Sequence, residues 1–144
     1  MNRSSLSTKL QVALAIQAVF SLVLIFYISQ TQLRHLQFGV VRPLADYFVQ
    51  VLAIIVPPVM LLLSFLAFRS PRRAIQASII AQLLVCLGAA RFLVPELLRV
   101  ARGEDVGWAG HLFIVGSAPV VLISFTFAAL FYHHLGVTRN SRGG

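Results

Sequence analysis

Four apolar stretches, each long enough to cross a lipid bilayer as a helix, occupy most of this 144-residue chain. A spanning α-helix needs about 20 consecutive residues that are mostly apolar, and each stretch meets this requirement. The sequence therefore predicts an all-α integral membrane protein, a four-transmembrane-helix bundle that forms a single membrane domain over residues 1–144. The predicted helices cover residues 10–30, 48–68, 74–95 and 109–132.

The composition excludes an ordinary soluble domain. Charged residues make up 11% of the chain and hydrophobic residues 58%, whereas charged residues are roughly a quarter of a soluble domain. The mean hydropathy is +0.87. The net charge of +8 does not indicate nucleic-acid binding, because the arginines lie between apolar runs instead of on one face of a soluble module. We expect the lipid bilayer as a partner, and no nucleic acid.

The first apolar stretch has a signal peptide as its alternative interpretation, because it follows a short polar segment that contains Arg3 and Lys9. Residues 29–32, Ser-Gln-Thr-Gln, are polar where small residues would form a cleavage site. We therefore interpret the stretch as a retained helix.

Basic residues predict the orientation. Loops with more Lys and Arg stay in the cytoplasm, and the two sides differ in their basic residues. One side has Arg3, Lys9, Arg69, Arg72, Arg73, Arg139 and Arg142, and the other has Arg34, Arg42, Arg99 and Arg102. Both termini should be cytoplasmic, with residues 138–144 as a disordered basic tail against anionic headgroups. The use of Arg over Lys and the compact hairpins favour a bacterial inner membrane.

An internal repeat is the most informative pattern in the chain. A shift of 65 residues places Gln17 over Gln82 and Ser21 over Cys86. With a gap in the second outer loop, a shift of 61 residues places Pro58 over Pro119. Two interpretations stay open: a duplication that made two tandem parallel helical hairpins, or a chance alignment of apolar helices.

The two glutamines have nearly the same predicted depth. Gln17 lies eight residues after Lys9, and Gln82 lies nine after Arg73, so both are about 12 to 13 Å from basic residues on the cytoplasmic side. Amide side chains can bond across a helix interface in a membrane. We favour a packing role for Gln17, Ser21, Gln82 and Cys86 over a role in lining a transport path.

Prolines inside two predicted helices, Pro57 and Pro58 in the second and Pro119 in the fourth, predict kinks near the bilayer midplane. The carbonyl groups that a proline frees could line a substrate site or bond to neighbouring helices. The second interpretation is the more common one.

Few residues could support chemistry. Arg91, Glu96 and Asp46 are candidates for an ion pair in the outer leaflet, with a substrate-binding role for Arg91 as the alternative. Pro95 should end or kink the third helix just before Glu96. His35 and His111 are weak candidates for a metal or haem site.

The chain contains no nucleotide-binding, metalloprotease or hydrolase motif. We expect no cofactor and no enzymatic activity. One interpretation is a non-catalytic accessory, assembly or scaffold subunit that packs against other membrane subunits or itself. The alternative is a small homo-oligomeric transporter or channel, with a path lined by Gln17, Gln82 and the proline-kinked helices.

Overall fold

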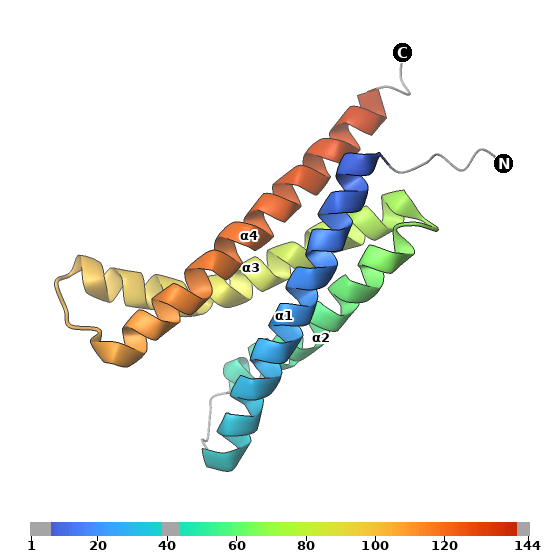
Figure 1. Cartoon of the computed structure of the whole chain (residues 1–144). Helices are drawn as coiled ribbons and strands as arrows, with labels where there is room; N and C mark the ends of the chain where they lie inside the picture. Colours follow the sequence, from blue (N-terminus) through green and yellow to red (C-terminus); the bar gives the residue numbers. More distant parts are fainter. Residues whose placement is uncertain (1–6, 39–43, 141–144) are drawn as a thin grey trace.

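The computed structural model describes the backbone of residues 7–38 and 44–140, and the side chains of residues 7–30 and 47–137. Four long helices follow one another along the described chain (Figure 1). They are α1 (Thr8–Phe38), α2 (Leu44–Leu66), α3 (Pro71–Ala101) and α4 (Gly107–Asn140). Each is long and apolar enough to cross a membrane. This confirms the prediction of an all-helical chain that is compatible with a multi-pass membrane protein.

Two of the helices continue well beyond the apolar runs that predicted them. α1 extends to Phe38 instead of ending near residue 30, and α4 extends to Asn140 instead of ending near residue 132. Backbone hydrogen bonds continue a helix after its hydropathy has fallen, since they do not depend on apolar side chains. Residues 138–140 of the predicted disordered tail are therefore helical, and the rest of that tail lies outside the described residues.

Pro95 does not end α3, although an end was one of the two outcomes that the sequence predicted for this residue, the other being a kink. The helix continues through this proline to Ala101. A proline removes the helical hydrogen bond to the carbonyl four residues earlier, which here is that of Arg91, while the turns on either side keep their bonds. Glu96 therefore belongs to the helix and not to a loop at its end.

The helices form two antiparallel pairs, α1 with α2 and α3 with α4, and α2 also packs on α3. The pairs converge where α1 begins and α4 ends, and they diverge toward the α3–α4 connection (Figure 1). We call the first of these the terminal end and the second the connection end. The α2–α3 turn also lies at the terminal end.

The apolar core is concentrated near the terminal end, where all four helices converge. Its main cluster consists of Leu10, Leu14, Ala67, Ala74, Ile75, Phe127 and Phe131. A second cluster joins α2 to α3 through Val56, Met60 and Ala81. Since the helix pairs diverge beyond these clusters, the other half of the molecule is less tightly packed.

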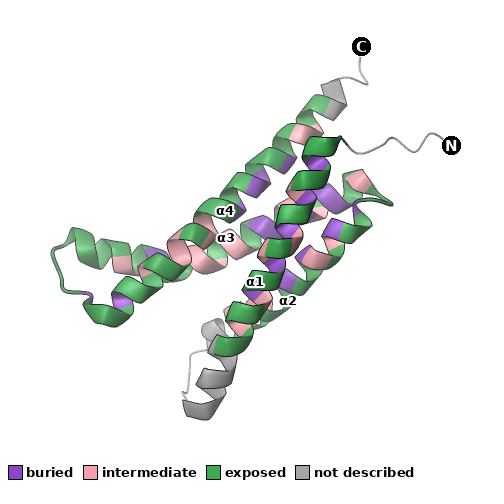
Figure 2. Cartoon of the chain, in the orientation of Figure 1, coloured by how far each residue is buried: buried purple, intermediate pink, exposed green. Residues whose placement is uncertain are grey.

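Large apolar side chains are exposed on all four helices, and Figure 2 shows exposed positions along the whole length of the described helices. Only 17–22% of the residues in the most apolar segment of each helix are buried within the protein. So much exposed apolar surface would not be stable in water, whereas lipid tails are a suitable solvent for it.

Candidate functional site

Gln17 on α1 lies at the centre of a buried polar layer. Its Nε2 donates to Ser64 Oγ on α2 at 3.0 Å and to Ser78 Oγ on α3 at 3.2 Å, and it lies 3.3 Å from the carbonyl oxygen of Met60. Gln82 Nε2 on α3 donates to Gln17 Oε1 at 3.1 Å. One side chain thus joins three helices. We call Gln17, Ser64, Ser78 and Gln82 the glutamine layer.

The glutamine layer is closed to solvent. Gln17, Ser78 and Gln82 have no exposed surface, and Ser64 is 3% exposed. The Gln17 amide has only two N–H groups for three acceptors, so these share its hydrogens. The serine of α2 also donates to the carbonyl of Met60 within its own helix, at 3.0 Å. The layer therefore forms a continuous network and leaves no opening through its centre.

Ser21 and Cys86, the two other predicted packing residues, lie beside this network instead of within it. Ser21 Oγ donates to the backbone carbonyl of Gln17 in its own helix at 2.8 Å. Cys86 Sγ lies 3.9 Å from the carbonyl oxygen of Val121 on α4. The structure brings the two glutamines together, but no hydrogen bond joins Ser21 to Cys86.

Two buried polar atoms, Gln82 Oε1 and Ser124 Oγ, have no hydrogen-bond partner among the described residues. Because α3 and α4 are antiparallel and Cys86 lies beside Val121, Ser124 lies within one residue of the level of Gln82. The polar layer thus extends toward α4, where no direct hydrogen bond completes it.

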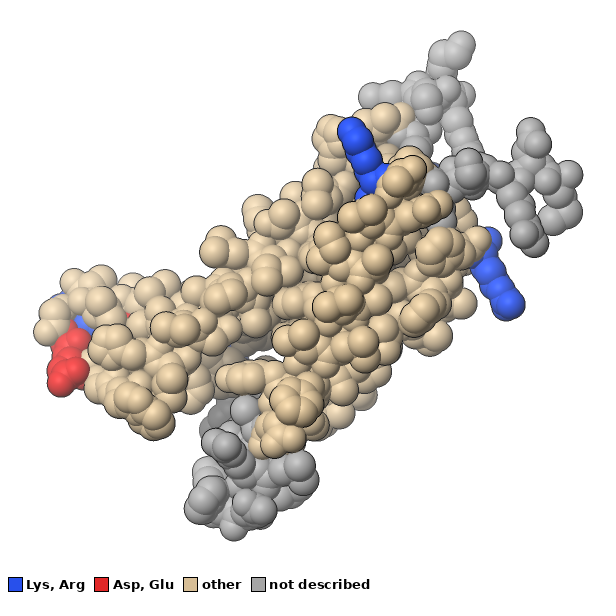
Figure 3. Space-filling view, in the orientation of Figure 1, with Lys and Arg blue, Asp and Glu red and all other residues tan. Residues whose placement is uncertain are grey.

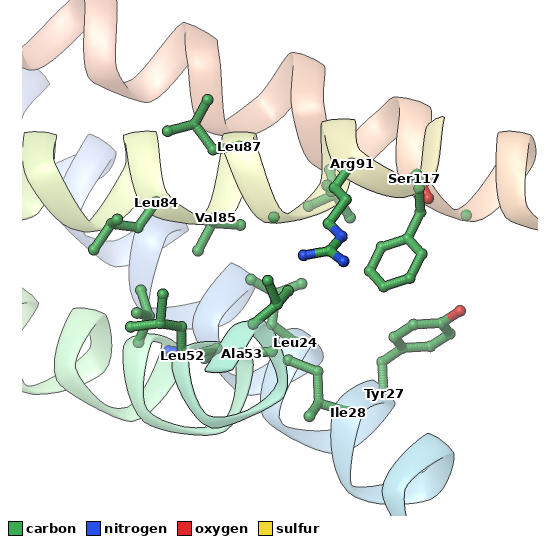
Figure 4. A pocket seen from close by; sticks show the side chains of 18 residues that line it. Leu24, Tyr27, Ile28, Leu52, Ala53, Leu84, Val85, Leu87, Arg91 and Ser117 are labelled. Carbon is green, nitrogen blue, oxygen red and sulfur yellow. The ribbon is translucent and has the colours of Figure 1, made fainter. Parts of the chain in front are cut away.

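An apolar cavity of about 340 Å³ lies between the two helix pairs (Figures 3 and 4). All four helices line it, through residues 24–28 of α1, 49–57 of α2, 84–92 of α3 and 116–120 of α4. These segments all lie on the connection-end side of the glutamine layer. The cavity is therefore the space left where the helix pairs diverge. The glutamine layer lies between this cavity and the terminal end.

Arg91 is the only charged side chain among the described residues that line the cavity. It belongs to α3, and its guanidinium points into the cavity from that helix (Figure 4). Tyr27 of α1 and Ser117 of α4 are polar residues in the same lining. Among the described residues, the site thus combines a long apolar wall with one basic side chain.

The predicted ion pair involving Arg91 is only partly described. Glu96 Oε2 accepts a hydrogen bond from Arg99 Nη1 at 3.2 Å, so this carboxylate has another arginine as a close partner. The side chain of Asp46, the second predicted carboxylate, lies outside the described residues.

The prolines that were predicted to kink helices lie within continuous helices. Pro57 and Pro58 are inside α2, and Pro119 is inside α4. Pro57 is fully buried and lines the cavity. Its missing N–H leaves the carbonyl of Ala53, another lining residue, without a helical hydrogen bond.

The histidines predicted as weak metal candidates do not form a described metal site. His111 Nδ1 lies 2.7 Å from the carbonyl oxygen of Gly107 in its own helix, while His35 lies outside the residues whose side chains are described. Within the described part of the chain, no three His, Cys, Asp or Glu side chains cluster closely enough to hold a metal ion.

Sequence reasoning did not identify Ser64 as a member of the layer, nor did it identify the cavity. A usable signal for the serine existed, because it is a lone hydroxyl residue within an apolar run and lies five residues before Arg69. The cavity has no comparable signal, since its lining differs little in hydropathy from the lipid-facing surface.

No protein-family model, curated protein or solved structure matches this chain.

Proposed function

We propose that this protein is a non-catalytic accessory subunit that packs within the membrane against a larger complex. The main evidence for this proposal is the glutamine layer, in which buried polar side chains of α1, α2 and α3 form hydrogen bonds with one another. Buried hydrogen bonds of this kind fix helix positions, whereas a conducting path needs polar groups that face an open space. Helix packing therefore accounts for the glutamines better than transport does.

Charge at the two ends supports an orientation with both termini in the cytoplasm. Among the residues with described side chains, the terminal end has four basic residues and no acidic one, while every described acidic residue lies toward the connection end. The terminal-end residues are Lys9, Arg69, Arg72 and Arg73. By the positive-inside rule this asymmetry favours a cytoplasmic terminal end, in a membrane that we propose to be a bacterial inner membrane.

The cavity favours a second candidate function, a small homo-oligomeric transporter. It lies on the connection-end side of the glutamine layer, and all four helices line it. Many transporters bind their substrate between two structural repeats and open to one side at a time. In this alternative, the glutamine layer would have to separate during transport.

Purification of the full chain in a mild detergent tests the accessory proposal. We expect it to elute with a second membrane subunit at fixed stoichiometry, and we expect the level of that subunit to fall when this chain is absent from the cell. The double substitution Gln17→Leu/Gln82→Leu, which disturbs helix packing, should lower the yield of the complex.

Measurements of solute flux into reconstituted vesicles test the transporter alternative. A homo-oligomer that conducts a solute by itself, and whose flux is lost in Gln17→Leu/Gln82→Leu while assembly stays intact, would exclude the accessory function in favour of the transporter. The exposed substitution Gln11→Leu on α1 is the matched control, since it makes the same chemical change outside the glutamine layer.

A further inference from the structure

We infer that the cavity between the helix pairs holds one acyl chain of a bilayer phospholipid, which enters from the side between α1 and α4. Four features support this occupant: the open side of the helix row, the width of that opening, the level of the cavity in the bilayer and its apolar wall. The site is independent of the proposed accessory function, because its ligand comes from the membrane itself.

The four helices pack as a row and not as a closed ring. The backbones of α1 and α2, of α2 and α3, and of α3 and α4 approach one another closely, whereas among the described residues no comparable approach joins α1 to α4. Figure 3 shows a hollow in the surface between the two helix pairs. Since α1 and α4 both line the cavity, the seam between them connects it with the surrounding lipid.

Two side-chain contacts cross this seam and limit its width. The rings of Phe20 on α1 and Phe127 on α4 have centroids 6.5 Å apart. The hydroxyl oxygen of Tyr27, also on α1, lies 3.5 Å from the position that a Cβ atom would take at Gly116 of α4. Phe20 and Tyr27 are seven residues apart, which is about 10 Å along a helix. Another helix with its side chains is about 10–12 Å wide, so it does not fit between these contacts, whereas a single hydrocarbon chain does.

The cavity lies at the level of one leaflet. Its α3 residues, 84–92, follow Arg73 by 11 to 19 residues, which is about 16 to 28 Å along the helix. The hydrocarbon core of a bilayer is about 30 Å thick. When Arg73 lies at the headgroups of one leaflet, the cavity therefore lies among the acyl chains of the other. Phospholipid tails are the apolar molecules that surround its opening.

The wall of the cavity suits a hydrocarbon chain. Leu24 of α1 and Leu84 of α3 line it from two different helices (Figure 4), and Val56 of α2 completes this apolar part of the lining. Gly88 also lines it, and a Cβ atom added there would meet no atom within 4 Å. Apolar walls gain dispersion contacts when a chain fills the space between them. The volume of about 340 Å³ lies within the range of about 300–1,000 Å³ that is usual for ligand pockets.

Photo-crosslinking in vesicles can test the proposal. The full-length protein is reconstituted in dioleoylphosphatidylcholine that contains a small fraction of phosphatidylcholine with a diazirine near the end of one acyl chain. Light converts the diazirine into a carbene that inserts into neighbouring bonds, and mass spectrometry of peptides locates the adducts. We expect adducts on Leu24 and Val56, which line the cavity and are only 6% and 7% exposed. Their neighbours Val23 and Ile55, 58% and 52% exposed, report lipid at the outer surface of the same helices.

Matched variants separate the site from the rest of the surface. Gly88→Leu fills the open space, so it should lower the adducts on Leu24 and Val56 about tenfold, in line with the usual cost of overpacking. Adducts on the two exposed neighbours should not change. Gly136→Leu is the control, because it makes the same change in α4 outside the cavity, where an added Cβ atom meets nothing within 4 Å. If Gly88→Leu does not fold, Ala53→Leu in the cavity lining provides the same test.

Three outcomes would overturn the proposal. Adducts on Val23 and Ile55 without adducts on Leu24 and Val56 would show that no acyl chain enters the cavity. Equal losses of the cavity adducts in Gly88→Leu and Gly136→Leu would show that these adducts do not depend on the open space. Protection of Leu24 and Val56 by a co-purifying membrane subunit, with labelling of the exposed neighbours intact, would identify a protein segment as the occupant.

Discussion

At the scale of single residues, Gln17 determines how three helices meet. Its amide is fully buried and has partners on α2 and α3. In membrane proteins an interhelical hydrogen bond of this kind contributes about 0.6 kcal/mol on average and reaches about 2. A buried polar group that loses its hydrogen-bond partner lowers the unfolding free energy more than the replacement of both partners by apolar groups does.

Separate and combined substitutions of Gln17 and Gln82 by leucine should therefore be coupled. We expect each single variant to lose about 1 to 2 kcal/mol of unfolding free energy, and the double variant to lose less than the sum. Reversible unfolding in mixed detergent micelles measures these values. Gln11→Leu combined with Gln82→Leu is the control and should be additive, because Gln11 is exposed on α1. Additivity of the Gln17 and Gln82 variants would contradict the structural role of their bond.

The common level of the two glutamines and a bond between their amides could be predicted from the sequence, but their serine partners could not. Counting residues from Lys9 and Arg73 placed both amides at one level, and the structure joins them at 3.1 Å. The bonds to Ser64 and Ser78 depend on how α1, α2 and α3 are rotated about their axes. Hydropathy does not determine this rotation when most faces of a helix are apolar.

At the scale of helices, the close approach of α3 and α4 depends on Gly110. A Cβ atom added at this position would lie 2.7 Å from the Cβ of Val106 and 2.8 Å from Glu96 Oε2. The connection before α4 is also short and contains a glycine with positive φ, Gly103 at +73°. Glycine adopts that conformation without steric penalty. Small residues thus allow α4 to fold back directly along α3.

Gly110→Ala should therefore destabilise the protein by about 1 to 3 kcal/mol, the usual range for overpacking. Gly136→Ala in the same helix is the matched control, since a Cβ atom there would meet nothing within 4 Å, and it should cause little change. Unfolding free energies of both variants provide the comparison. Equal unfolding free energies of the two variants would contradict this prediction, because they would show that α3 and α4 can move apart at Gly110 without loss of stability.

The existence of each helix was easier to predict than its ends. Hydropathy marks the part of a helix that fits the bilayer, but α1 and α4 continue as polar helices beyond it. Pro95 is a further example. The sequence suggested a helix end or a kink at this residue, and the helix does not end there, because the turns on either side of the proline keep their hydrogen bonds.

At the scale of the whole molecule, the two hairpins resemble each other only in part. A tandem duplication would make Gln17 and Gln82 equivalent, and their direct bond supports this proposal. The surroundings differ, however. Ser64 accepts a bond from Gln17, while its counterpart after a shift of 61 residues is Phe125, which has no hydroxyl group. The unpartnered oxygen of Gln82 is consistent with this loss of symmetry.

The divergence of the hairpins could not be predicted from hydropathy. The side chains that line the cavity, such as Leu24 and Leu84, have the same composition as those that face lipid. Only the relative angle of the two pairs separates one environment from the other. Charge, in contrast, differs between the ends of the molecule and is visible in the sequence, so the sequence supports a prediction of orientation that hydropathy alone does not supply.

The proposed orientation makes opposite predictions for the two ends. In a Cys86→Ala background, we expect Glu104→Cys at the connection end to react with a membrane-impermeant maleimide in intact cells. Ser70→Cys, in the α2–α3 turn beside Arg69 and Arg72, should react only after the membrane is opened. Both positions are exposed, so accessibility within the protein does not bias the comparison. Because basic residues resist translocation, labelling of Ser70→Cys from outside would reverse the orientation, and it would place Arg91 in the cytoplasmic instead of the outer leaflet.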